Sequence, residues 1–431
     1  MDLKPSGYKP RLLDDILKRK LKAFGALEVA GTKFCGKTWS SLAQGASIIH
    51  IDDDATKQMV ELDVSLALEG ARPHIIDEWQ DVPKIWDAVR RRVDDQANVK
   101  GQFILTGSST VDMAAVSHSG AGRIARVQMR PMSLFESGHS TGSISLGALF
   151  EGEFSQQAVQ TDVRQLAELI CQGGWPASLD IDPELSGELP SQYLDALFSV
   201  SAQKAGLDSH RARGVSVSLA RNVGKTLTYK ALYQDVSEGD AAARADDALF
   251  RKQMDPYLSF LKGQYALEDQ TGWDAPIKSR SRVRTKPKRS FADPSLPAAL
   301  LSMTPERLLM NMQVFGNLFE ELCLRDLRVY ASAMRLTPEP RIYYYSDADG
   351  LDVDVVIELP DGRWGAFEIK LSEEKTPQAE KNLLRLRDKV TANPAAQNRQ
   401  PAFLAVLTGK ATFARRTPAG VYVIPLTLLT A

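Results

Sequence analysis

The residues most capable of chemistry stand near the amino terminus, where residues 29–39 read VAGTKFCGKTW. Two glycines separated by four residues and followed by lysine and threonine form the pattern of a phosphate-binding loop. In such loops, backbone N–H groups surround phosphate oxygens, the lysine reaches the β- and γ-phosphates, and the hydroxyl holds Mg²⁺. We therefore predict ATP-type ligand contacts from Gly31, Thr32, Lys33, Phe34, Cys35, Gly36, Lys37, Thr38 and Trp39, with Thr38 also binding the metal.

Two further apolar runs end in side chains that suit the same chemistry. The first run ends in Asp77 and Glu78, and the second, residues 103–106, leads into Ser108. In P-loop enzymes an aspartate holds the Mg²⁺ shell, and a further residue orients the attacking water. We expect these roles for Asp77 and Glu78. We expect Ser108 or Thr106 to sense the γ-phosphate. A glycine-rich turn without a ligand would not account for all three strand ends, so the sequence predicts nucleoside triphosphate binding.

The segments around these residues alternate between strand and helix patterns. Residues 47–51 form a further apolar run, and residues 8–24 and 82–93 have apolar side chains at helical spacing. Alternating strands and helices are typical of a parallel sheet that binds its ligand at the carboxyl ends of the strands. We therefore predict an α/β P-loop domain of the AAA-like kind over residues 1–145, which ends in a glycine- and serine-rich connection.

Arg123 follows the third of these strand ends in the chain. Its charge could neutralise the transition state of phosphoryl transfer, within the same subunit or on a neighbouring one in a homo-oligomer. A surface strand with solvated arginines is an equally good interpretation of the same residue.

The middle of the chain is largely helical. We predict a helical linker or lid over residues 146–205, followed over residues 206–275 by three helices and a strand with a turn. Three helices with a hairpin describe a winged-helix-like unit, a module that contacts DNA or protein.

A basic segment follows, in which cations alternate with small or apolar residues. An extended chain would bring the alternating cations to one side, which suits a phosphate backbone. A solvated basic linker is an equally good interpretation. The predicted DNA contacts are Lys278, Arg280, Arg282, Arg284, Lys286, Lys288 and Arg289.

The predicted last domain, residues 276–431, carries a second set of chemical side chains. An acidic helix over residues 314–330 precedes a strand with Asp354, and a hairpin partner strand carries Glu368-Ile-Lys370. This spacing puts Glu368 and Lys370 on one face of the strand. Two carboxylates can bind Mg²⁺ while a lysine orients water. The pattern predicts a restriction-endonuclease-like α/β domain, either an active nuclease with Asp354 and Glu368 as metal ligands or a non-catalytic module.

Composition limits the remaining possibilities. A chain of 431 residues is too long for one core, and its net charge of −1 gives no global attraction to nucleic acid. The three cysteines are far apart and show no metal-ligand spacing, which suits reduced thiols in the cytoplasm. No apolar run is long enough to span a bilayer, so we expect a cytoplasmic protein without membrane contact.

Taken in order, the motifs resemble a prokaryotic family of AAA-type P-loop ATPases, of the archaeal-ATPase kind, that carry a C-terminal domain of unassigned function. The matching segments are residues 10–11, 31–38, 75–78, 105–108, 122–123, 131–136, 173–176, 291–296, 316–320, 352–354 and 368–370. The resemblance covers nearly the whole chain and implies ATP as the nucleotide. The loop departs from the family, because Thr32-Lys33-Phe34-Cys35 replaces a run that usually contains arginine and glutamine.

Three functions are compatible with these patterns. The first is an Mg²⁺-dependent ATPase whose cycle drives or gates a C-terminal module acting on DNA. The second is an ATP-regulated nuclease that uses Asp354, Glu368 and Lys370. The third is a nucleotide switch that binds a protein partner in its ATP state without turnover.

Overall fold

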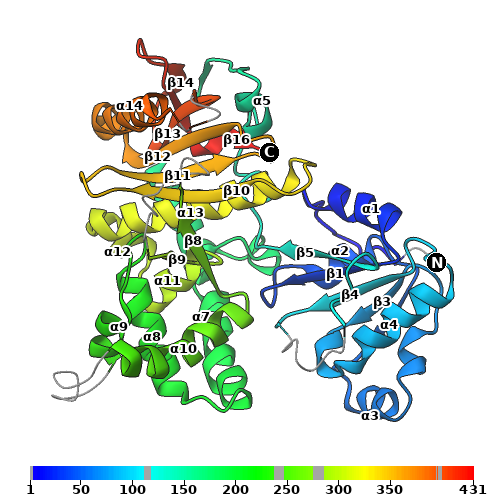
Figure 1. Ribbon diagram of the computed structural model, residues 1–431. Helices are drawn as coiled ribbons and strands as arrows, with labels where there is room; N and C mark the ends of the chain where they lie inside the picture. The colour runs from blue at the N-terminus through cyan, green and yellow to red at the C-terminus, as the bar shows by residue number, and fades with distance from the viewer. Residues whose placement is uncertain (1–2, 111–117, 237–246, 275–285, 395, 397–399) are drawn as a thin grey trace. The chain divides into compact units, whose positions relative to one another are not determined.

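The computed structural model describes residues 3–110, 118–236, 247–274, 286–394, 396 and 400–431 (Figure 1). The chain forms two compact units. The first comprises Met1–Pro131 with Leu261–Ala266, and the second comprises Met132–Phe260 with Leu267–Ala431. The predicted boundaries at residues 145, 205 and 275 do not separate compact units. Strands from both the predicted middle and the predicted C-terminal segments join one sheet, which explains the difference.

The first unit is built on a five-stranded sheet with the order β2-β3-β4-β1-β5. All neighbouring strands run parallel, as the alternating pattern predicted. Because parallel strands end at the same edge, the segments that follow β1, β3 and β4 meet there. The strands are β1 (Ala26–Gly31), β2 (Ser47–His50), β3 (His74–Asp77), β4 (Phe103–Gly107) and β5 (Ile124–Met129).

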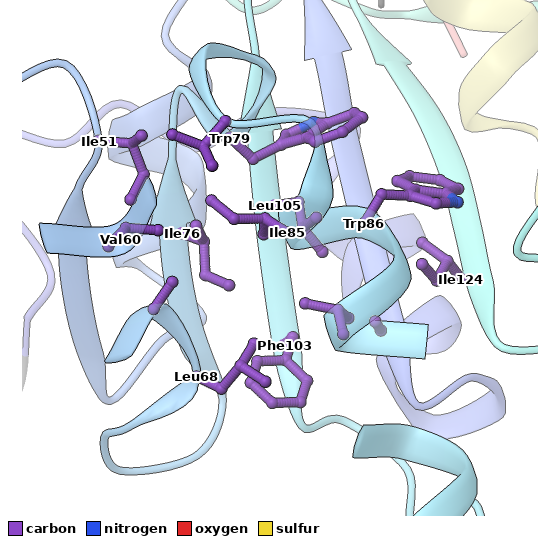
Figure 2. Packing of buried hydrophobic residues seen from close by; sticks show 14 of the residues in the cluster. Ile51, Val60, Leu68, Ile76, Trp79, Ile85, Trp86, Phe103, Leu105 and Ile124 are labelled. Atoms are coloured by element: carbon purple, nitrogen blue, oxygen red, sulfur yellow. The ribbon is translucent and has the colours of Figure 1, made fainter. Parts of the chain in front are cut away.

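Apolar layers cover both faces of this sheet. Alternate strand residues point to opposite faces, so Phe103 and Leu105 belong to one core cluster and Ile104 to the other. Figure 2 shows the first cluster, in which Ile85 lies beside Leu105 and Phe103 lies beside Leu68. The helices of this unit are α1 (Asp14–Ala23), α2 (Lys37–Leu42), α3 (Asp54–Leu62) and α4 (Lys84–Asp95), with 3₁₀ turns η1 (Val64–Leu68) and η2 (Trp79–Asp81).

The second unit contains a nine-stranded sheet with the order β7-β14-β15-β13-β12-β11-β10-β8-β9. Its centre is a β10-β11-β12 antiparallel meander, which pairs through β12 with the parallel strand β13. The strands are β7 (Gln157–Ala158), β8 (Leu267–Gly272), β9 (Lys288–Phe291), β10 (Arg341–Ser346), β11 (Asp352–Glu358), β12 (Trp364–Ser372), β13 (Phe403–Lys410), β14 (Phe413–Arg416) and β15 (Tyr422–Pro425). A separate pair joins β6 (Ile144–Ser145) and β16 (Leu429–Thr430).

Helices precede and flank this sheet. Two of them belong to its central part: α13 (Met312–Ala333) comes before β10, and α14 (Thr376–Ala392) connects β12 to β13. Three helices and strand β8 lie within the predicted segment 206–275, whereas the partner strand of β8, β9, lies in the segment predicted as an exposed basic stretch. Thr226 forms an additional bridge to Lys288. The other helices are α5 (Leu146–Phe150), α6 (Val163–Gln172), α7 (Glu188–Ala196), a π-helical turn (Leu197–Ala202), α8 (Ser209–Arg221), α9 (Tyr229–Val236), α10 (Asp247–Gly263), α11 (Ser295–Leu300) and α12 (Pro305–Met310).

A buried charged group holds the middle of the second unit together. The Arg325 guanidinium pairs with Asp293 at 2.9 Å and with Asp326 at 2.7 Å. The same two carboxylates accept backbone N–H groups of Gly174 and Leu134, at 2.9 and 3.1 Å. Three of the motifs behind the family resemblance therefore meet at one ion pair, which indicates a structural role for them. Across the part of the chain that the structure describes, no helix has the length and apolar character to cross a membrane.

Candidate active site

The glycine-rich loop connects β1 to α2, as predicted. Phe34 and Gly36 have left-handed backbones, with φ of 64° and 101°. At Gly31 a side chain is excluded, since a Cβ atom would stand 2.1 Å from the Met129 carbonyl oxygen. The buried Lys37 Nζ donates to the carbonyl oxygen of Thr32 at 2.8 Å. The lysine thus lies over its own loop and is paired there with a neutral acceptor.

Asp77, at the end of β3, is the meeting point of three side chains. Its Oδ1 accepts hydrogen bonds from Thr38 Oγ1, at 3.1 Å, and from Thr106 Oγ1. Its Oδ2 lies 3.1 Å from His50 Nδ1, on the neighbouring strand β2. The predicted pair Thr38 and Asp77 is therefore in contact, although 39 residues separate the two in the chain.

This hydroxyl and carboxylate suit Mg²⁺, which prefers oxygen ligands and usually keeps several waters and phosphate oxygens. Few protein ligands are then needed. The described residues contain no group of three or more His, Cys, Asp and Glu side chains placed to hold a metal ion.

Glu78 follows directly and has a left-handed backbone, with φ of 55°. Its N–H donates to Thr106 Oγ1 at 3.3 Å. Its Oε2 accepts hydrogen bonds from Ser108 Oγ, at 2.8 Å, and from Gln80 Nε2. Both predicted sensor residues, Thr106 and Ser108, thus contact the acidic residues of β3. Gln80 and His50 were not predicted, because neither stands in a recognisable motif.

Arg123 lies away from this group of residues. It immediately precedes β5, whose first residue is paired with Ala26, while Met129 at the other end is paired with Gly31. Arg123 is therefore at the amino edge of the sheet and the loop is at the carboxyl edge. The half-exposed Arg123 pairs with Asp94 at 2.8 Å. The prediction that Arg123 acts on the loop of its own subunit is wrong, because β5 runs parallel to β1 and its start lies at the opposite edge of the sheet from the loop. The order of residues in the sequence did not show in which direction β5 runs. Action on a neighbouring subunit stays a prediction.

Arg11 is a site residue that the chemistry of the motifs did not reveal. Its buried guanidinium donates from Nη1 to the Cys35 carbonyl oxygen, in the loop, and from Nη2 to the Arg130 carbonyl oxygen, both at 2.8 Å. The loop is thereby tied to the end of β5. A Pro-Arg pair before the first helix was the available signal, and only the family resemblance drew attention to it.

The second unit brings together the other predicted residues. Lys370 Nζ lies 3.2 Å from Asp354 Oδ2 and 2.5 Å from Glu368 Oε2. Asp354 Oδ2 also accepts the Ile369 N–H at 2.7 Å, and Glu368 Oε1 accepts from Asn382 at 3.0 Å. Three of the four carboxylate oxygens thus have donors from the protein. The carboxylates could hold a metal ion only after Lys370 moved, so their present arrangement is an internal ion pair.

Proton affinities at this second site are shifted. Burial, together with the charge of Asp354, raises the pKa of Glu368 to about 7. Burial alone would lower the pKa of Lys370, but the charges of Asp354 and Glu368 outweigh it and raise that pKa. Glu320, on α13, has its pKa raised to about 8 by burial and by the charge of Asp354. These shifts agree with the prediction that one carboxyl group of the site keeps its proton to a higher pH.

Two of the predicted DNA-contacting cations are buried. Lys288 Nζ lies 3.4 Å from Asp352, and Arg289 donates to the Leu227 carbonyl oxygen at 3.1 Å. Their prediction as phosphate contacts is wrong, because all four residues of β9, an edge strand of the sheet, are buried. Lys286 is exposed. Lys278, Arg280, Arg282 and Arg284 lie outside the described residues.

Comparison with known families agrees with the geometry of the first unit. Residues 24–137 match the family model of an AAA domain. The N-terminal unit is an AAA-type P-loop ATPase domain. The match to the AAA domain ends at residue 137, between Pro131, where the main segment of the first unit ends, and the predicted boundary at 145.

Two further family models match the rest of the chain, and each is described as a domain of unknown function. They cover residues 163–307 (DUF8612) and 315–429 (DUF4143). The second match includes Asp354, Glu368 and Lys370. It also begins well after residue 276, where the sequence analysis placed the start of the C-terminal domain.

Similar proteins include two uncharacterized mycobacterial proteins, Rv2008c of Mycobacterium tuberculosis and Mb2031c of Mycobacterium bovis. Each is 25% identical to this chain over 362 residues, which cover 82% of this chain and 72% of the relative. A Walker-type ATPase of Pyrococcus abyssi is a similar solved structure, with 12% identity and a TM-score of 0.44. That alignment covers 70% of this chain and 98% of the archaeal protein.

Proposed function

We propose that the ATPase domain binds Mg²⁺-ATP and hydrolyses it, and that its nucleotide cycle gates a C-terminal unit acting on DNA. The observation that supports this most strongly is the pairing of Thr38 with Asp77 and of Ser108 with Glu78. Both pairs lie at the edge of the sheet where the glycine-rich loop leaves β1. Nucleotide, metal and water sites would then be adjacent.

Each residue has a defined task in this proposal. Lys37 exchanges its bond to the Thr32 carbonyl for the β- and γ-phosphate oxygens. Thr38 and Asp77 would hold Mg²⁺, which neutralises phosphate charge when bound. Glu78 orients and polarises the attacking water. Thr106 fixes the positions of the two acidic residues, because its hydroxyl accepts the Glu78 N–H and donates to the Asp77 carboxylate. Arg11 keeps the loop attached to β5.

Steady-state ATP hydrolysis, measured with and without duplex and single-stranded DNA, tests the proposal. We expect Mg²⁺-dependent turnover that responds to at least one DNA. Tight ATP binding with turnover no higher than background would instead favour the nucleotide switch. Turnover that no DNA changes would remove DNA from the proposal and leave a protein partner.

The charge balance of the middle region supports DNA as the partner. Residues 204–287, which leave out the buried Lys288 and Arg289, contain 15 Lys and Arg against 10 Asp and Glu, whereas the whole chain has a net charge of −1. A local excess of cations is the usual feature of a nucleic-acid-binding surface. Three helices and strand β8 also lie in this region, and we propose that they belong to a winged-helix-like unit.

The connection between β8 and β9 contains Arg280, Arg282 and Arg284, which we propose contact phosphates. Replacing all three by alanine should lower the slope of log affinity against log salt by about 2–3, because each phosphate contact releases about one counterion. Fluorescence anisotropy with labelled duplex DNA measures this slope. A wild-type protein that binds no DNA at low salt contradicts the proposal.

An ATP-regulated nuclease is a second candidate, and one observation favours it. The order α13, β10, β11, β12, α14, β13, with an antiparallel meander joined to a parallel strand, suits a restriction-endonuclease-like core. In this proposal Asp354 and Glu368 would hold the metal ion and Lys370 would orient water, after the present ion pair opened.

A further inference from the structure

We propose that Gln80 is a positioning residue for ATP hydrolysis, whose amide holds the Glu78 carboxylate in its working orientation. This inference rests on the proposed function, in which Glu78 acts on the attacking water. Gln80 belongs to no motif, and its role follows from contacts alone.

The order of the strands defines where the Glu78 carboxylate lies. Glu78 follows β3, Ser108 follows β4, and the glycine-rich loop follows β1. Strand β4 stands between the other two in the sheet. Since Ser108 donates to Glu78 at 2.8 Å, the carboxylate of Glu78 reaches from β3 over the end of β4. It is therefore directed toward the strand that carries the loop.

Two donors hold this carboxylate by one oxygen. Ser108 Oγ and Gln80 Nε2 both donate to Oε2 of Glu78. Neither bond uses Oε1, which can accept a hydrogen bond from a water molecule. A carboxylate fixed at one oxygen and open at the other is suited to orient water, since its rotation about the side-chain bonds is restricted.

The backbone explains how a residue two positions away can make this contact. Glu78 is left-handed, and the 3₁₀ turn Trp79–Asp81 that follows brings Gln80 back beside it. Only the NH₂ group of the amide can face a carboxylate, because its oxygen is an acceptor.

The other end of the same amide has a cost. Gln80 Oε1 is buried and has no hydrogen-bond partner among the described residues. It lies 3.1 Å from the position that a Cβ atom would take at Gly107. A buried, unpaired oxygen disfavours folding. The hydrogen bond from the amide nitrogen to Glu78 would explain why the glutamine is kept here although its oxygen is unpaired.

The test compares Gln80→Ala with wild type in the full-length chain, with Gln58→Ala on α3 as a matched control at an exposed glutamine. We expect kcat of Gln80→Ala to fall by about 10- to 100-fold, since small displacements of a catalytic group have effects of this size. ATP affinity, measured by calorimetry, and KM should change by less than about twofold, because binding does not depend on the orientation of Glu78.

Two results would overturn the inference. An unchanged or increased kcat in Gln80→Ala would show that the amide does not hold Glu78 in a working orientation. A loss of ATP affinity equal to the loss of kcat, with a lower melting temperature, would show a merely structural role. Wild-type protein without turnover would overturn the proposed function as well, so the two failures are distinguishable.

A second variant removes the donor and keeps the size of the side chain. Gln80→Glu puts a second carboxylate beside Glu78, and like charges repel. We expect kcat to fall at least as far as in Gln80→Ala while ATP affinity is retained. Wild-type kcat in Gln80→Glu would show that the amide donor is not needed.

Discussion

Two regions of this molecule contain the same residue types, two carboxylates and a lysine, in different states of charge pairing. In the ATPase domain, hydroxyl, amide and imidazole groups contact Asp77 and Glu78, and Lys37 donates to a carbonyl oxygen. In the C-terminal site, which belongs to the second unit, the ammonium group of Lys370 stands between Asp354 and Glu368.

The two sites differ in whether their carboxylates and their lysine pair with one another. Among the described residues, no lysine or arginine pairs with Asp77 or Glu78, and Lys37 donates to a carbonyl oxygen, so these side chains can take a cation or a phosphate from outside. In the C-terminal site one lysine lies between two carboxylates and balances one of their two charges. Removing one partner of such a buried pair leaves an unpaired charge, which destabilises the fold. We therefore expect mutations at the first site to change chemistry and mutations at the second to change stability first.

Glu78→Gln is the sharpest test of this comparison. The amide cannot polarise water, whereas Asp77 still holds the metal ion, so ATP hydrolysis should fall by about 10²–10⁴-fold while ATP binding persists. Steady-state kinetics and calorimetry measure the two quantities, with Glu61→Gln on α3 as an exposed control. Wild-type turnover in Glu78→Gln would mean that the residue serves only the turn that follows β3.

Lys37→Ala tests whether the lysine charge is kept for phosphate. A charge-assisted hydrogen bond contributes about 1.5–3 kcal/mol, so ATP affinity should fall at least about tenfold. Stability should change little, because the described residues give Lys37 a single hydrogen-bond partner, the Thr32 carbonyl oxygen. Lys57→Ala, on α3, provides the control. Unchanged ATP affinity by calorimetry would overturn the assignment of the loop.

Some residues of the ATPase site could be predicted from the sequence, and others could not. The loop residues and Asp77 could be found because each has a local motif, and the parallel-sheet rule then predicts that Thr38 meets Asp77. Arg123 could not be placed in this way, since its edge of the sheet depends on the direction of β5.

Burial was harder to predict than contact. Lys288 ends an alternating basic pattern that suits an exposed segment, and Arg289 directly follows it, but both side chains are buried in β9, which pairs with β8. The contact of Glu368 with Lys370 was predicted from the spacing of residues along one strand. The hydrogen bond from Asn382 to Glu368 comes from helix α14, and the spacing within a strand gives no information on the position of that helix. The contact of Gln80 with Glu78 depends on the left-handed backbone of Glu78, and no local sequence pattern indicates that conformation.

Asp354→Ala separates the two interpretations of the C-terminal site. It removes one partner of the ion pair and one acceptor of the Ile369 N–H, so the unfolding free energy should fall by about 1–3 kcal/mol. ATP hydrolysis should be unchanged. Nicking of supercoiled DNA with Mg²⁺ or Mn²⁺, with and without ATP, completes the test. Cleavage by wild type that disappears in Asp354→Ala would break the comparison and establish the nuclease.

The smallest expected effect is a pH dependence of stability. The pKa of Glu368 is raised to about 7 in the folded protein, so below that pH the folded state binds a proton more tightly than the unfolded chain does. The resulting stabilisation is complete below the ordinary glutamate pKa of about 4.3 and is lost as pH rises through about 7.

Glu320 and Glu321 have pKa values raised to about 8, mainly by burial, and act with the same sign. Melting temperatures should therefore fall between about pH 5 and pH 8, and less steeply in Glu368→Gln, which has no proton to lose. The two slopes should differ by at most about 1.4 kcal/mol per pH unit, or about 3 °C per pH unit for a unit of this size. An identical pH dependence in Glu368→Gln and wild type would show that Glu368 carries its charge in the folded state throughout. Lys370 would then fully compensate that carboxylate, and the second site would be more strongly neutralised than its burial indicates.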